Sequence, residues 1–143
     1  MKVFLHGILL LGALLSAPAA AGGADLTVTV VGLRSDKGEV RFGLYDRPDR
    51  FPHGDGVIKT GVARIDGGRA VHVFRDLAAG RYAVSVFHDE DGDGKFDRSL
   101  IGLPLEGYGF SNDAKVVLSP PSFKEAALTV GDAGGTCVIN IVY

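Results

Sequence analysis

Short apolar runs that alternate with polar residues recur along the chain between glycine-rich segments. The alternation is clearest in LTVTVVGL (26–33) and EVRFGLYD (39–46), where every second residue is Leu, Val or Phe over most of the run. A period of two is typical of β-strands with one buried face. The residues Ser35-Asp36-Lys37-Gly38 between the two runs favour a turn, so the sequence predicts a β-hairpin here.

Further runs of this kind extend the prediction to an all-β protein. They predict strands over 57–65, 70–74, 81–88, 100–103, 115–118, 126–130 and 136–143. The run 81–88 is apolar on both faces in its middle, which is expected of a central strand. No segment has a helical period, and the one predicted helix is a single turn near 48–51. Seven or eight short strands about ten residues apart predict an immunoglobulin-like or prealbumin-like β-sandwich.

Gly80-Arg81-Tyr82 adds a second indication of this fold. A tyrosine that enters a strand after a glycine turn is typical of the corner of such sandwiches, where its hydroxyl bonds to nearby backbone. Cys137, the only cysteine, alternates with Ile139 and Ile141. We therefore expect a small buried side chain there, and no intramolecular disulfide is possible.

The first 21 residues have the pattern of a secretory signal peptide. Lys2 precedes an apolar run over 3–15, and small residues over 19–21 precede Gly22. The run is shorter than the roughly 20 residues that span a bilayer, and no later run approaches that length. The sequence thus predicts cleavage after residue 21, one domain over 22–143, and a periplasmic or secreted protein that does not span a membrane.

The net charge of the chain is only −2, and its charges are interspersed except in one segment. The absence of a basic stripe in the sequence makes nucleic acid or an anionic membrane a poor candidate for a partner. The exception is HDEDGDGKFD (88–97), in which five carboxylates face a single lysine. Such repulsion in one turn suggests a bound cation.

The spacing in this acidic turn matches the first nine positions of a calcium-binding loop. Asp89, Asp91, Asp93 and Asp97 would supply carboxylates and Lys95 its backbone carbonyl. A hard cation prefers oxygen ligands about 2.3–2.6 Å away, and alternate residues of a curled loop can provide them. Gly94 stands where the loop must bend sharply.

The pattern departs from a complete loop at position 12, where Leu100 replaces the usual glutamate. Glu106, the first acidic residue downstream, could fold back to complete the shell. The alternative is a solvated hairpin turn at 91–92 or 93–94, since Asp-Gly pairs favour turns. Zinc is not expected, because His88 has no second His or Cys at ligand spacing.

Three stretches resemble the DUF2141 family, secreted bacterial proteins named only as a domain of unknown function. They are AGRYAVSVFHDEDGDGKFD (79–97), GLPLEGYGFSND (102–113) and PPSFKEAALTV (120–130). The opening stretch 26–46 also fits, so the resemblance covers essentially the whole chain after residue 21. The resemblance implies a prealbumin-like or carboxypeptidase-regulatory-like sandwich and no established activity. This chain has Asp91 and Asp93 where the family often has Asn, which should raise cation affinity.

Two functions follow from these observations. The first is a non-catalytic module, stabilised by calcium, that contacts a protein, glycan or envelope partner. Tyr108 and Phe110 of the GYGFS segment (107–111) would make that contact, or these aromatics could instead pack to close the end of the sandwich.

The second is a small hydrolase-type enzyme on a transthyretin-like sandwich that uses a histidine and carboxylates. The candidate histidines are His53, an expected surface His72 and an expected buried His88. No nucleophile motif accompanies them, and the chain ends in INIVY rather than the Tyr-Arg-Gly-Ser tail of the similar hydroxyisourate hydrolases. We therefore expect no enzyme.

Overall fold

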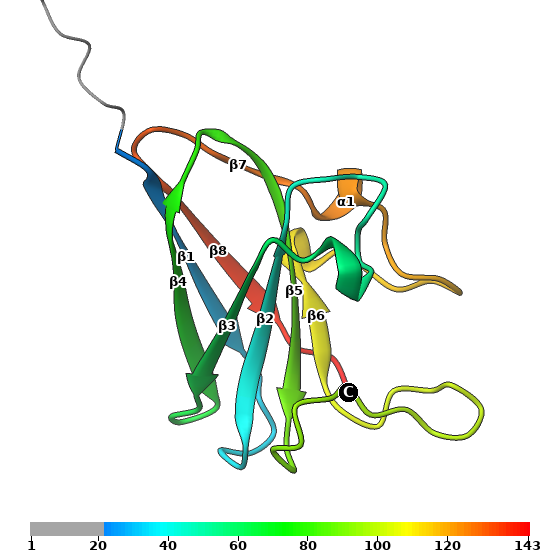
Figure 1. Ribbon diagram of the computed structural model, residues 1–143. Coiled ribbons are helices and arrows are strands. Elements are labelled where there is room, and N and C mark those ends of the chain that lie inside the picture. The colour runs from blue at the N-terminus through cyan, green and yellow to red at the C-terminus, as the bar shows by residue number, and fades with distance from the viewer. Residues whose placement is uncertain (1–21) are drawn as a thin grey trace, which may run out of the picture.

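Two β-sheets pack face to face in the computed structural model, which describes residues 22–143 (Figure 1). The three-stranded sheet has the order β4-β1-β8, with bounds Arg69–Leu77, Ala24–Val31 and Gly135–Asn140. The five-stranded sheet has the order β3-β2-β5-β6, with bounds Lys59–Arg64, Glu39–Tyr45, Gly80–Asp89 and Tyr108–Phe110, and β7 (Leu128–Val130) also pairs with β5. The predicted all-β sandwich is therefore confirmed.

Each sheet is built around one central strand. β1 pairs antiparallel with β4 and parallel with β8. β5 pairs antiparallel with β2, β6 and β7, and most of its residues are buried. The central position predicted for the run 81–88 is confirmed, and it explains why that run is apolar on both faces.

The main core lies between the two sheets. The inward side chains of β1 and β2 in it include Val28, Val30, Phe42 and Leu44. A smaller apolar cluster covers the outer face of the five-stranded sheet; its buried members are Tyr45, Phe51, Ala83, Phe123 and Ala126. The second cluster fixes the segment after β2 and the short helix α1 (Phe123–Ala126) against the sheet.

Two sequence predictions of buried groups are confirmed. The hydroxyl of Tyr82 donates to the carbonyl of Ala78 over 2.8 Å, which forms the expected tyrosine corner. Cys137 lies buried on β8 beside the core, and burial raises the pKa of its thiol. A thiol with a raised pKa is a poor nucleophile, as expected of a structural cysteine.

The predicted hairpin between 26–33 and 39–46 is wrong. β1 and β2 belong to different sheets, and the segment 32–38 crosses between them. The Asp36 carboxylate accepts hydrogen bonds from the N–H groups of Gly67 (3.1 Å) and Gly68 (2.9 Å), in the turn between β3 and β4. The turn residues of this segment therefore bind another turn instead of folding β2 back onto β1.

Three local predictions are also wrong. The segments 100–103 and 115–118 are exposed loops rather than strands, and 48–51 is a turn rather than a helix. Single 3-10 turns lie at Gly54–Gly56 and Ser111–Asp113. Among the described residues the one α-helix is at 123–126, where Ser122 and Glu125 make a reciprocal capping box. The strand β6, at 108–110, lies where the sequence indicated a loop.

The predicted signal peptide, residues 1–21, lies outside the described residues. Among the described residues, no helix is long and apolar enough to cross a membrane.

Candidate metal centre

The acidic turn begins at the last residue of β5, at one end of the sandwich (Figure 1). The start of β2 packs tightly against it, since Glu39 pairs with Asp89. A Cβ atom at Gly38 would lie 1.9 Å from the carbonyl oxygen of Asp89, so only glycine fits there. Gly94 has a φ of +80°, which confirms the sharp bend that its position in the turn predicts.

Asp89 is the anchor of the turn and is fully buried. Its Oδ1 accepts a hydrogen bond from the N–H of Gly92 and its Oδ2 one from that of Gly94, both at 2.9 Å. Arg41 Nε donates to the same Oδ2 over 2.6 Å. Burial alone would raise the pKa of Asp89, but these bonds and the charge of Arg41 outweigh it and hold the pKa below 3.8. Asp89 is thus ionised in the folded protein.

Glu106 reaches back into the turn from the segment before β6, as the sequence analysis allowed. One carboxylate oxygen accepts from the N–H of Glu90 (3.1 Å) and the other from the N–H of Asp97 (3.2 Å). The side chain therefore joins the two ends of the acidic turn. Burial, together with the charges of Asp89 and Asp97, raises the pKa of Glu106 above 4.5 despite these hydrogen bonds.

Asp91 completes a cluster of three carboxylates. One oxygen atom from each of Asp89, Asp91 and Glu106 lies within 4.8 Å of the other two, and only Asp91 is exposed to solvent. All three are hard oxygen donors, and each accepts at least one hydrogen bond from a backbone N–H group. The cluster could hold a metal ion, and its donor set suits calcium or magnesium rather than zinc.

The other predicted ligands lie outside this cluster of three. Asp93 is exposed and accepts the N–H of Lys95 over 2.8 Å, while its own N–H donates to Asp91 over 3.1 Å. Lys95, whose carbonyl was expected to be a ligand, is exposed on the same turn, and Asp97 is half-buried. These local bonds shape the turn, and Asp93 is exposed to solvent.

Two arginines from outside the turn reduce its excess negative charge, and the sequence analysis missed both. Arg41 on β2 bonds to Asp89, and Arg34 forms an ion pair with Glu90. Arg34 also lies over the ring of Tyr143, with its Cζ 4.4 Å from the ring centre. Alternation along β2 shows only that Arg41 faces away from Val40 and Phe42, and it does not reveal the partner across the strand. The cation-free turn is therefore less repulsive than its sequence suggests.

The three candidate histidines occupy different places. His88 is fully buried, with Nδ1 2.7 Å from the Tyr143 hydroxyl and Nε2 2.7 Å from the Lys37 carbonyl oxygen, as the buried prediction requires. His72 is half-buried against the rings of Phe42 and Phe74, so it is less exposed than predicted, and burial lowers its pKa. His53 is exposed in the segment after β2.

Tyr108 and Phe110 are the two half-buried side chains of β6. Their rings lie 6.3 Å apart and continue an aromatic row from Phe96 to Phe51 on the outer face of the sheet. A hollow beside β6 is lined by these two aromatics and, among others, by Lys115, Val116 and Val142. The expected partner-binding residues are thus accessible in part, on a strand and not on a loop.

The fold and the site together define a small β-sandwich with a buried acidic cluster at one end. Residues 28–137 match the model of a family described as uncharacterized protein conserved in bacteria (DUF2141). The match covers most of the chain, so the protein belongs to this family. No match was found among the curated proteins or the solved structures.

Proposed function

We propose that the protein is an exported, non-catalytic module whose sandwich is stabilised by one calcium ion at the acidic turn and which contacts a partner in the cell envelope. The observation that carries the proposal is the convergence of Asp89, Asp91 and Glu106 at the end of β5. Glu106 comes from a separate segment, so the three carboxylates meet only in the folded chain. A cation bound there would stabilise the native state alone.

The raised pKa of Glu106 supports a cation over an empty solvated turn. Burial next to the charges of Asp89 and Asp97 makes its ionised form costly, and a bound cation would remove that cost. Calcium takes six to eight oxygen ligands and tolerates irregular geometry. Water could complete the shell beside the three carboxylates, because Asp91 is exposed to solvent.

Thermal unfolding in EDTA and in about 2 mM calcium tests the site. An extracellular site with a Kd of about 10⁻⁴ to 10⁻³ M would add about 0.6–1.8 kcal/mol at this concentration. The unfolding midpoint of a domain of this size should then rise by about 2–8 °C. Magnesium should give a smaller rise, because it demands a stricter geometry.

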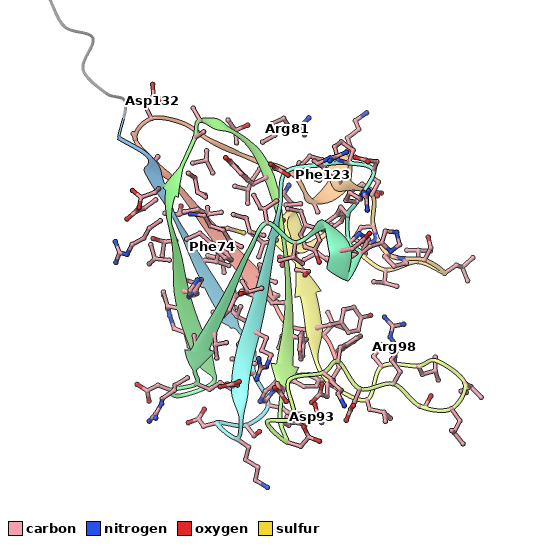
Figure 2. The ribbon with its side chains drawn as sticks, viewed as in Figure 1. Phe74, Arg81, Asp93, Arg98, Phe123 and Asp132 are labelled. Atoms are coloured by element: carbon pink, nitrogen blue, oxygen red, sulfur yellow. The ribbon has the colours of Figure 1, made fainter. Side chains whose placement is uncertain are left out.

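Asp91→Asn is the sharpest variant, because Asp91 is exposed and the bonds of Asp89 to Arg41 do not involve it. Asp132→Asn is its matched control: Asp132 is an exposed aspartate at the opposite end of the sandwich from Asp93 (Figure 2). We expect Asp91→Asn to abolish the calcium-dependent rise and Asp132→Asn to retain it. A wild-type midpoint that calcium does not move would refute the calcium site.

The separation of the histidines supports a non-catalytic role. Both ring nitrogens of His88 are hydrogen-bonded, one to the Tyr143 hydroxyl and one to the Lys37 carbonyl. The ring of His72 packs against Phe42 and Phe74. Neither the hollow beside β6 nor the one lined by Asp36, Glu39 and Arg64 includes a histidine. A general base must lie within hydrogen-bond reach of a bound substrate, and these placements do not provide it.

The proposed export rests on residues 1–21, whose sequence has the three regions of a signal peptide. Expression in a bacterial host followed by fractionation should place the protein in the periplasm or the medium. Mass spectrometry of the purified protein should give an N-terminus at or near Gly22. An uncleaved N-terminus in the cytoplasmic fraction would contradict this part of the proposal.

A further inference from the structure

Two exposed apolar loops project from the β6 edge of the sandwich toward the same side (Figure 1). The first, loop A, spans 98–105 and leads toward β6; the second, loop B, spans 114–121 and follows it. Seven of the thirteen exposed large hydrophobic residues of the described chain belong to them: Leu100, Ile101, Leu103, Leu105, Val116, Val117 and Leu118. Single exposed apolar residues are normal in proteins, but a concentration of this kind marks an interaction site.

Loop A holds its apolar side chains in a fixed turn. The N–H of Gly102 donates to the Ser99 carbonyl and the N–H of Ser99 to the Leu103 carbonyl, both over 2.8 Å. Leu100 and Ile101 occupy the two central positions, where turns normally carry polar residues. Leu100 has the full exposure of an unfolded residue. The backbone bonds therefore present an aliphatic pair to solvent at the tip of an ordered loop.

Loop B presents a similar tip with backbone strain. Leu118 is as exposed as Leu100 and has a φ of +65°, in the left-handed region that leucine rarely adopts. Strain of this kind persists where the surrounding structure imposes it and gathers at functional sites. The short strand β6 lies between the two loops, which project toward the same side of the sandwich (Figure 1). Both tips can therefore meet one surface at the same time.

Each loop carries one cation, while the acidic residues Asp97 and Glu106 flank loop A and Asp113 precedes loop B. Arg98 begins loop A, with its Cζ 5.0 Å from the ring centre of Phe96, and Lys115 lies next to the apolar residues of loop B. Neither 98–105 nor 114–121 contains an aspartate or a glutamate. Figure 2 shows Arg98 projecting from the same side of the molecule as loop A. Each loop therefore combines an aliphatic tip with one cation near its start, and the acidic residues lie beyond the ends of the loops.

We propose that loops A and B insert their tips into the interface of a lipid bilayer. The inference rests on the exported location proposed above and names a membrane as the envelope partner. Protein-binding hot spots favour Trp, Tyr and Arg over Leu and Val, whereas exposed aliphatic tips on loops that each carry a cation suit the boundary between headgroups and acyl chains. The chain has no basic stripe, so the contact is mainly apolar and the two cations add to it.

Co-flotation of the purified protein with phospholipid vesicles tests the inference. We expect binding to pure phosphatidylcholine vesicles in EDTA, and tighter binding when a quarter of the lipid is phosphatidylglycerol and calcium is present. Calcium would offset the negative charge of the acidic turn, which adjoins loop A. Binding in EDTA depends on the loops alone, so the loss of the calcium effect would count against the calcium site and not against the loops.

The double variant L100S/I101S should lower the partition coefficient at least about tenfold, because it removes two large apolar side chains from the inserted tip. L118S tests loop B independently and should act in the same direction. The matched control is V62S/V71S, which removes two exposed valines from β3 and β4, away from the β6 edge. The control should bind vesicles as the wild type does.

Three results would overturn the inference. The first is a wild-type protein that floats with neither kind of vesicle, in EDTA or in calcium. The second is an L100S/I101S variant that binds as tightly as the V62S/V71S control. The third is a dimer in analytical ultracentrifugation that L100S/I101S abolishes without any vesicle binding by the wild type, since the loops would then pair two copies of the chain.

Discussion

Arg41 Nε lies 2.6 Å from Oδ2 of Asp89, and this ion pair joins β2 to the buried start of the acidic turn. Removing the guanidinium would leave a fully buried carboxylate without its charged partner. We expect Arg41→Gln to lower the free energy of unfolding by about 2 kcal/mol in EDTA. Urea denaturation followed by circular dichroism measures this change.

Arg75→Gln is the control for that variant. Arg75 pairs with Asp25 over 2.9 Å, but both side chains are largely exposed, so its loss should change stability by less than about 0.5 kcal/mol. Arg41→Gln should also bind calcium more tightly than the wild type, because a competing positive charge has been removed. Equal destabilisation by the two arginine variants would show that the buried Arg41–Asp89 pair contributes no more to stability than the exposed Arg75–Asp25 pair.

Glu106 should make stability fall as the pH rises when calcium is absent. Its folded pKa lies above the unfolded value of 4.5, because burial and nearby carboxylates disfavour the ionised form. The stability associated with protonated Glu106 is complete below pH 4.5 and is lost as the pH rises through the folded pKa. Asp89 acts in the opposite direction but only below pH 3.8, where its depressed pKa matters.

Urea denaturation between pH 4 and 8 in EDTA checks this behaviour. The wild type should lose stability relative to Glu106→Gln as the pH rises above 4.5, and saturating calcium should remove the difference in slope. Glu125→Gln is the control, because the pKa of Glu125 is lowered by its bonds to Ser122 and its linkage lies below pH 4.5. Parallel pH profiles for the wild type and Glu106→Gln would contradict the assignment.

The hydroxyl of Tyr143 satisfies a buried imidazole. It lies 2.7 Å from Nδ1 of His88 and accepts the N–H of Arg34 over 3.1 Å. Tyr143→Phe should cost about 1–3 kcal/mol of unfolding free energy, because it leaves the His88 nitrogen unpaired. Tyr108→Phe, on the exposed side of β6, should stay within about 0.5 kcal/mol of the wild type. Equal effects of the two changes would refute the structural role of the His88–Tyr143 bond.

Cys137 should be almost unreactive in the folded protein. It is buried on β8, and burial raises the pKa of its thiol. Reaction with a chromogenic disulfide reagent should be at least about a hundredfold slower in buffer than in denaturant, because it requires the strand to open. Rapid labelling of the native protein would show that β8 is more accessible than the structure indicates.

The strands of the core could be predicted from the sequence because the alternation of apolar and polar residues along a strand indicates which face is buried. Val40, Phe42 and Leu44 follow that rule and lie in the main core. The same rule does not say which sheet a strand joins, and so the first two strands were wrongly paired. The contact that decides it, between Asp36 and the Gly67-Gly68 turn, joins residues 31 and 32 positions apart.

The errors at 100–103 and 115–118 have a different cause. A short apolar run predicts burial only if something in the fold covers it, and loops A and B remain exposed.

For the candidate site, the spacing of Asp89, Asp91 and Gly94 and the return of Glu106 could be inferred locally. The ion pairs with Arg34 and Arg41 could not, because they depend on strands that meet only in the folded sheet. The capping box of α1, Ser122 with Glu125, was readable in the sequence and was overlooked.

The parallel pairing of β1 with β8 governs when the chain can fold. Leu26 lies opposite Gly135 and Val31 opposite Asn140. The first strand of the sandwich therefore cannot complete its pairing until the last strand has been synthesised. Contacts between residues so distant in sequence are entropically costly to close and slow to form. During synthesis the three-stranded sheet stays incomplete until about residue 140 has emerged. Such a delay would favour the export proposed above, because a chain with an incomplete sheet remains unfolded for longer.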